Sequence, residues 1–195
     1  SDPPRSLLDA TKSVLRPGWR RWRSVIDDME KDLNRQIFEA TQTNRGDSVL
    51  EVAAGNGSFT VKAADRVGDE GSVTATDISE TMGDFTRELA RHHGFSNVET
   101  MVMNGEDLEF EDNTFNRVFC LISLMLFADP QSAVAEAYRV LEPGGYYAIT
   151  VFNKPETTTW MALAAKIAMK HAGRDMPPPG TPGLFALGNA EYLEQ

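Results

Sequence analysis

From residue 48 onward, short apolar segments typical of strands alternate with segments whose apolar residues recur at helical spacing. Segments of the first kind predict strands over residues 48–52, 72–76, 98–103, 115–122 and 146–152. Segments of the second kind predict helices over residues 19–40, 58–67, 80–93, 131–141 and 157–172. Strands that alternate with helices form a parallel sheet covered on both faces. The sequence therefore predicts an α/β fold with a doubly wound, mostly parallel sheet of about five strands.

The length of 195 residues suits one such domain with one sizeable core. We assign residues 1–40 to an N-terminal helical cap segment and residues 41–195 to the sheet domain. No apolar run approaches the roughly 20 residues that a membrane-spanning helix needs, so we expect no membrane span. The single cysteine, Cys120, excludes an internal disulfide and suits a reducing compartment, so we expect a cytoplasmic protein.

The net charge of −10 argues against a nucleic-acid partner, because phosphate binding depends on clustered lysines and arginines. One cluster departs from this average, since it interleaves four arginines with two tryptophans: Arg16, Trp19, Arg20, Arg21, Trp22 and Arg23. Its simplest interpretation is a solvated helix face with two buried tryptophans. The three histidines, without a Cys-x-x-Cys pair, indicate no metal site.

The turn after the first expected strand carries the first sign of a ligand site. A strand that turns at once into a helix needs residues that tolerate positive φ, and Gly55, Asn56 and Gly57 are of that kind. The helix expected from Ser58 would point free N–H groups at a ligand lying across the turn. Tight turns also use small residues for purely structural reasons, so this signal is weak by itself.

A carboxylate stands 20 residues after Gly57, just beyond the second expected strand. This residue, Asp77, can accept hydrogen bonds from both ribose hydroxyls of an adenosine ligand. The structural alternative is that Asp77 only caps the next helix. Ser79 is better placed for that purpose, so we expect Ser79 to cap the helix and leave Asp77 free for a ligand.

Two residues favour a sulfonium cofactor over a nicotinamide dinucleotide. Thr60 stands where the dinucleotide pattern G-x-G-x-x-G has its third glycine. Glu51, at the end of the first strand, would lie beside the pyrophosphate of a dinucleotide, whereas it can receive the ammonium group of a cationic ligand. A nicotinamide-dependent oxidoreductase is therefore the second choice.

Four segments, in order, resemble the motifs of class I S-adenosylmethionine-dependent methyltransferases. VLEVAAGNGSFT is similar to the first motif and TATDIS to the second. MNGEDLEFEDNTFNRVFC resembles the third and fourth motifs, and YRVLEPGGYYAIT resembles the strand-five motif. The resemblance runs from about residue 36 to 155 and is closest to the ubiquinone/menaquinone-biosynthesis C-methyltransferase-like group, methyltransferase type 11. The N-terminal signature of that group is absent, and its Glu-x-Ser after strand five reads Val151-Phe152-Asn153 here, so we infer the broad group rather than quinone synthesis.

The resemblance implies a Rossmann-like fold, S-adenosyl-L-methionine as the cofactor and S-adenosyl-L-homocysteine as the product. It assigns to the cofactor site Glu51, Ala53, Gly55, Asn56, Gly57, Asp77, Ile78, Met82, Asn104, Gly105, Glu106, Cys120 and Leu121. Two structural alternatives stay open: Asn104 is also a plausible turn residue, and Cys120 is also a plausible core residue.

The resemblance also gives these residues roles. The glycine turn and Glu51 would hold the methionine moiety and the ribose, and Cys120 and Leu121 would line the methionine side. Ile78 and Met82 would contact the adenine. The side-chain oxygen of Asn104 would accept from the adenine amino group, and the N–H of the following glycine would face the ring.

Methyl transfer is an in-line displacement at a carbon that the sulfonium already activates, so the enzyme mainly aligns donor and acceptor and excludes water. No catalytic residue stands out, and Asp129 is expected to cap the helix that follows it. The acceptor pocket is expected to draw on Trp19, Trp22, Ser123, Met125 and Asn153, with Leu124, Leu126, Phe127 and Trp160 nearby. Their aromatic and apolar character predicts a small, largely apolar organic acceptor.

The resemblance further implies a C-terminal antiparallel hairpin, for which the sequence leaves no room. A proline-rich loop over 176–182 and a segment over 190–195 with helical character follow the last expected helix. We therefore expect the fifth strand to lie at an open edge of the sheet. Either the chain is truncated, or a partner such as a second copy covers this edge. A non-catalytic cofactor-binding module and an RNA methyltransferase using the arginine cluster stay open as alternative functions.

Overall fold

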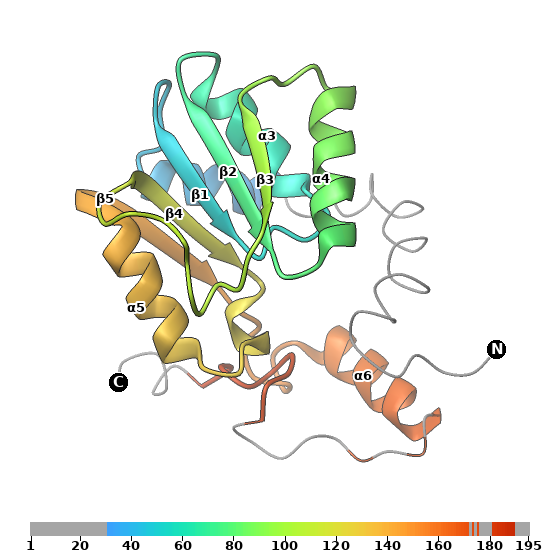
Figure 1. The fold of residues 1–195 in the computed structure, drawn as a ribbon. Coiled ribbons are helices and arrows are strands. Elements are labelled where there is room, and N and C mark those ends of the chain that lie inside the picture. Colours follow the sequence, from blue (N-terminus) through green and yellow to red (C-terminus); the bar gives the residue numbers. More distant parts are fainter. Residues whose placement is uncertain (1–30, 172, 174, 176–180, 190–195) are drawn as a thin grey trace.

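The computed structural model of the protein describes residues 31–171, 173, 175 and 181–189. Five parallel strands form one sheet in the order β3-β2-β1-β4-β5, so the strand order reverses between β1 and β4 (Figure 1). The strands are β1 (Ser48–Val52), β2 (Ser72–Asp77), β3 (Val98–Val102), β4 (Phe115–Leu121) and β5 (Leu141–Thr150). The predicted doubly wound α/β fold is thus confirmed.

Helices cover both faces of this sheet (Figure 1). The helical residues 31–40, α3 (Ser58–Val67) and α4 (Glu80–His92) lie on one face, and α5 (Pro130–Val140) lies on the other. The short 3-10 helix η2 (Leu124–Leu126) and α6 (Thr159–His171) lie beyond the carboxyl ends of the strands. No helix in the described ranges combines the length and apolar character needed to cross a membrane.

The central strand β1 is buried on both faces because its side chains alternate between the two helical layers. Val49 packs in the layer beneath α3, together with Ile37, Phe59, Ala63, Ala64, Val67, Val73 and Phe119. Leu50 packs in the layer beneath α5, together with Val52, Val118, Cys120, Leu124, Ala133, Ala137 and Val140. The strand β1 is therefore packed between two apolar layers, which fix the position of its carboxyl end.

The sequence predicts the fifth strand from residue 146, but β5 begins at Leu141 and includes Pro143-Gly144-Gly145. α5 ends at Val140, and the next residue already belongs to β5 and pairs with Phe115. The following register pair joins Tyr146 to Arg117, so residues 142–145 form an irregularity within the strand, with Gly144 at φ 83°. Proline and the two glycines therefore lie in a bulge-like irregularity inside β5.

Several predictions concern residues outside the described ranges, among them Trp19, Trp22 and the arginine cluster, the 176–180 part of the proline-rich loop, and residues 190–195. Within the described part of the chain, β5 pairs with β4 alone, as expected for a strand at the sheet edge. Residues 181–189 contact η2, where the Gly183 N–H donates to the Met125 carbonyl (2.9 Å). Leu187 from this segment packs against the core beneath α5.

Candidate cofactor site

The glycine turn joins β1 to α3 at the switch point of the sheet. Ala53, Gly55 and Gly57 have φ values of 58°, 59° and 75°, so the predicted need for positive φ is confirmed at both glycines. Ala53 adopts the same conformation despite its Cβ, which costs about 1–2 kcal/mol. α3 begins at Ser58 as predicted, and its first N–H groups lie beside this turn.

Thr86 of α4 packs directly against the turn. Its Oγ1 donates to the Gly55 carbonyl (3.1 Å), and the residue is buried. A Cβ built at Gly57 would lie 2.9 Å from the Thr86 Cα. Reasoning from the sequence missed Thr86, because a threonine within an amphipathic helix carries no signal of what it touches.

The Asp77 carboxylate spans the turn and the start of α4. Its Oδ2 accepts from the Gly55 N–H (2.9 Å) and its Oδ1 accepts from the Ser79 N–H (2.8 Å). Ser79 stands at the N-cap position of α4 as expected, but the expectation that Asp77 is left free is wrong, because both of its oxygens already accept hydrogen bonds. The Ser79 side chain makes no cap bond, while its own amide donates to the carboxylate two residues earlier.

Burial raises the pKa of Asp77 above its ordinary value of 3.8, and the two accepted N–H bonds partly offset this rise. Each carboxylate oxygen keeps a second lone pair, so hydrogen bonding to the turn does not exhaust its capacity to accept from a ligand. Beside Asp77, Ile78 is 70% exposed, and the Ser79 Oγ is buried without a hydrogen-bond partner. Met82 is buried beneath them instead.

Glu51 closes the other side of the turn. Its side chain is only 3% exposed, and Thr60 Oγ1 in the first turn of α3 donates to Glu51 Oε2 (2.5 Å). A buried carboxylate at the end of a central strand is costly unless charged or polar groups compensate it. The structure thus brings two carboxylates, Glu51 and Asp77, to the carboxyl ends of adjacent strands on either side of the glycine turn.

The segment after β3 forms a turn that supports the neighbouring loop. Asn104 Oδ1 accepts from the Glu106 N–H (3.1 Å), which matches the turn alternative for Asn104. A Cβ at Gly105 would lie 2.7 Å from the Phe127 ring, so this position requires glycine. Glu106 Oε1 accepts from the N–H groups of Ala128 (2.8 Å) and the next residue (3.0 Å), and so fixes the loop after η2. Asp129 caps α5 by accepting from Ser132, as predicted.

Cys120 faces the α5 layer and is 1% exposed, which matches the core alternative. Burial raises the pKa of its thiol to about 12, while a hydrogen bond with Tyr147 acts in the opposite direction. Burial likewise raises the pKa of Tyr147. Leu121, the next residue, is partly buried at the strand end, where Ser123 Oγ donates to its carbonyl (2.9 Å) and lies 3.3 Å from the Ala53 carbonyl.

Because its thiol is buried and neutral, Cys120 is expected to resist modification by an aromatic disulfide reagent at pH 8. Labelling of the native protein should be at least about a hundredfold slower than labelling in guanidinium chloride, followed by thiolate absorbance. Rapid stoichiometric labelling of the native protein would show that the layer between β4 and α5 opens readily.

The expected acceptor side lies around η2 and the start of α6. Met125 and Leu124 are buried, whereas Leu126 is 47% exposed. Asn153 is exposed, and its Oδ1 accepts from the Lys154 N–H (2.7 Å). Apolar rings gather beyond it, since Phe152 contacts both Trp160 and Phe185 with centroids 6.5 Å apart in each pair.

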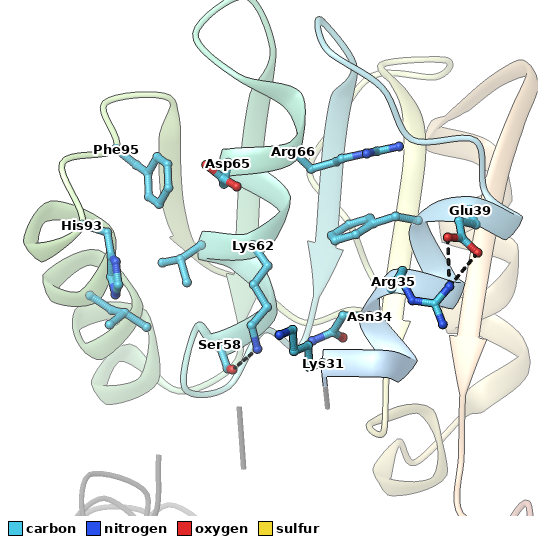
Figure 2. A pocket seen from close by; sticks show the side chains of 13 residues that line it. Lys31, Asn34, Arg35, Glu39, Ser58, Lys62, Asp65, Arg66, His93 and Phe95 are labelled. Atoms are coloured by element: carbon cyan, nitrogen blue, oxygen red, sulfur yellow. Dashed lines mark hydrogen bonds and ion pairs between the residues drawn. The ribbon is translucent and has the colours of Figure 1, made fainter. Parts of the chain in front are cut away.

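A separate groove of about 720 Å³ lies between α3, α4 and the helical residues 31–40 (Figure 2). Its walls mix cations with two acids and a few apolar rings: Lys31, Arg35, Lys62, Arg66, Glu39, Asp65, Phe38 and Phe95. The groove reaches the start of α3 at Ser58, whose Oγ accepts from Lys62 Nζ (3.3 Å). It runs along the helical layer, whereas ligands of open parallel sheets bind at the carboxyl ends of the strands.

The sheet order and the glycine turn at its switch point, flanked by two carboxylates, define a Rossmann-like fold, which the chain shares with solved structures. The chain belongs to the ubiE/COQ5 methyltransferase family, which matches residues 20–176. S-Adenosylmethionine is the cofactor named for similar structures, such as the SAM-dependent methyltransferase from Aquifex aeolicus. That structure has a TM-score of 0.57 and 23% identity, over 72% of this chain and 78% of its own.

Two further proteins are similar to this chain. The ubiquinone/menaquinone biosynthesis C-methyltransferase UbiE of Enterobacter sp. (strain 638) is 38% identical over 122 residues, which are 62% of this chain and 49% of the relative. The chain thus spans about half the length of the curated relatives it matches. The PH0226 protein from Pyrococcus horikoshii OT3 is 27% identical, with a TM-score of 0.58 over 73% of this chain and 62% of its own.

Proposed function

We propose that this chain binds S-adenosyl-L-methionine at the carboxyl edge of its sheet and transfers the methyl group to a small, largely apolar acceptor, leaving S-adenosyl-L-homocysteine. The observation that carries the proposal is the pair of carboxylates, Glu51 and Asp77, held on either side of the glycine turn. A cofactor with a cationic amino-acid end and a ribose diol has a complementary group for each carboxylate.

Each part of the edge then has a task. Asp77 accepts from the ribose hydroxyls while it continues to hold the Gly55 amide. Ile78 supplies an exposed apolar surface for the adenine, and the turn at Asn104 and Gly105 borders the ring's polar edge. Glu51 receives the ammonium group of the methionine end, beside the carboxyl end of β4.

The bound sulfonium supplies an activated methyl carbon. The chain's own contribution is to align the acceptor with that carbon and to exclude water. The proposed transfer therefore includes no general base. The apolar side chains beside η2 and α6, among them Leu126 and Trp160, would shield the acceptor.

The UbiE relatives are named as C-methyltransferases of ubiquinone and menaquinone biosynthesis, so an apolar quinol is the first acceptor to test. Calorimetry of residues 1–195 with S-adenosylmethionine, S-adenosylhomocysteine and NAD tests the cofactor. A labelled-methyl screen over quinols, phenols, amines and RNA then tests the acceptor. Preferential binding of NAD would overturn the cofactor assignment, and transfer to RNA alone would overturn the small-molecule acceptor. Binding of S-adenosylhomocysteine without any transfer would favour a non-catalytic module.

We also propose that a second copy of the chain covers the edge of β5. No strand in the described part of the chain pairs with β5 on the side away from β4. The backbone groups on that side can therefore pair with a strand of another molecule. Light scattering coupled to size-exclusion chromatography measures this directly, and a mass of one chain across the micromolar range would reject the dimer.

A further inference from the structure

We propose that Thr60 is a positioning residue for the cofactor's ammonium group, acting through Glu51. This inference rests on the proposed function. Thr60 is fully buried in the first turn of α3, and its hydroxyl donates to Glu51 Oε2 at 2.5 Å. In the sequence this threonine only marked a missing glycine, whereas in the fold it contacts the carboxylate that closes the glycine turn.

The geometry explains why Glu51 needs such a partner. The strand register sets Glu51 between Ala75 of β2 and Phe119 of β4, so its side chain leaves the sheet on the face covered by α3. A glutamate with 3% exposure loses most of its hydration, and its carboxylate can rotate about the last side-chain bond. A short hydrogen bond from a rigid helix compensates the charge and restricts that rotation.

Thr60 directs its hydroxyl away from the backbone of its own helix. Threonines within helices often return their hydroxyl to the carbonyl of the preceding turn. Here the hydroxyl points instead to the end of β1, across from the loop that precedes α3. The carboxylate is thereby aimed before any ligand arrives, and this preorganisation lowers the cost of binding a cation.

A purely structural role for Thr60 would affect every ligand of the site alike. A positioning role affects only ligands that carry the ammonium group. Two ligands separate these cases, because S-adenosylhomocysteine has the amino-acid end and 5′-methylthioadenosine has the same adenosine without it. Both would use Asp77 and Ile78, and only the first would use Glu51.

The experiment is calorimetry of residues 1–195 with both ligands, on the wild type and on Thr60→Val, Thr60→Ser, Glu51→Gln and Glu51→Gln/Thr60→Val. Thr60→Val keeps the shape and removes the hydroxyl, so S-adenosylhomocysteine should bind about tenfold more weakly or worse. Thr60→Ser restores the donor and should stay within about threefold of the wild type. All variants should bind 5′-methylthioadenosine within about threefold of the wild type.

The double variant tests whether Thr60 acts through Glu51. In the Glu51→Gln background, Thr60→Val should cause less than about a threefold further loss, because the interaction it supports is already gone. Equal losses for the two ligands in Thr60→Val, or full additivity in the double variant, would overturn the positioning role. Failure of the wild type to bind either adenosine ligand would overturn the proposed function itself. Binding of 5′-methylthioadenosine also reports that each variant is folded.

Discussion

Replacement of Asp77 by alanine is expected to weaken S-adenosylhomocysteine binding about a hundredfold or more, measured by calorimetry. The carboxylate holds the amides of Gly55 (2.9 Å) and Ser79 (2.8 Å), and in the proposed function it also accepts from the ribose. Its removal deletes ligand hydrogen bonds and releases the glycine turn at the same time. Hydrogen bonds to a charged group contribute about 1.5–3 kcal/mol each, so two lost bonds account for this factor.

Two further variants control this result. Asp77→Asn keeps one carbonyl oxygen as an acceptor and should lose about tenfold in affinity. Asp84→Asn changes an exposed aspartate of α4, which pairs with Arg87 at the surface, and should leave affinity unchanged. If Asp77→Ala bound S-adenosylhomocysteine as tightly as the wild type, the ribose assignment would be wrong.

The pH dependence of binding follows from the same residue. Burial raises the Asp77 pKa above 3.8, so wild-type affinity should fall as pH is lowered through that raised value, and Asp77→Asn should lack this component. The effect on stability has its own sign. The folded chain binds this proton more readily than the unfolded chain, so the Asp77 contribution to the free energy of unfolding decreases as pH rises from 3.8 to the raised pKa.

Replacement of Gly57 by alanine is expected to lower the free energy of unfolding by about 4 kcal/mol, or the melting temperature by about 10 °C. The residue has φ 75°, and a Cβ there would meet the Thr86 Cα at 2.9 Å. Positive φ costs an alanine about 1–2 kcal/mol, and overpacking against a helix backbone costs about 1–3 kcal/mol more.

Gly55 provides the matched control within the same turn. It has φ 59° but no atom within 4 Å of a built Cβ, so Gly55→Ala should cost only about 1–2 kcal/mol. Thermal melts followed by circular dichroism compare the two variants directly. Equal destabilisation would mean that α4 does not press on the turn as the structure describes.

Much of the site could be read from local signals. Glycines at the start of a helix indicate positive φ, which the structure confirms for Gly55 and Gly57, whereas the ribose contact of Asp77 stays a prediction. The hydrogen bonds that Asp77 makes could not be named in advance, because they depend on where the fold places the Gly55 and Ser79 amides.

The spacing of apolar residues and of glycines in the sequence determined the α/β class, the succession of strands and helices along the chain, and the turn where a ligand is expected. These properties depend on neighbours a few residues apart in the chain. Only the tertiary structure decided that Thr60 supports Glu51, that Thr86 presses on the glycine turn, and that Cys120 belongs to the core. Those contacts join residues from different elements, and the packing of helices on the sheet brings them together at distances that no local pattern encodes.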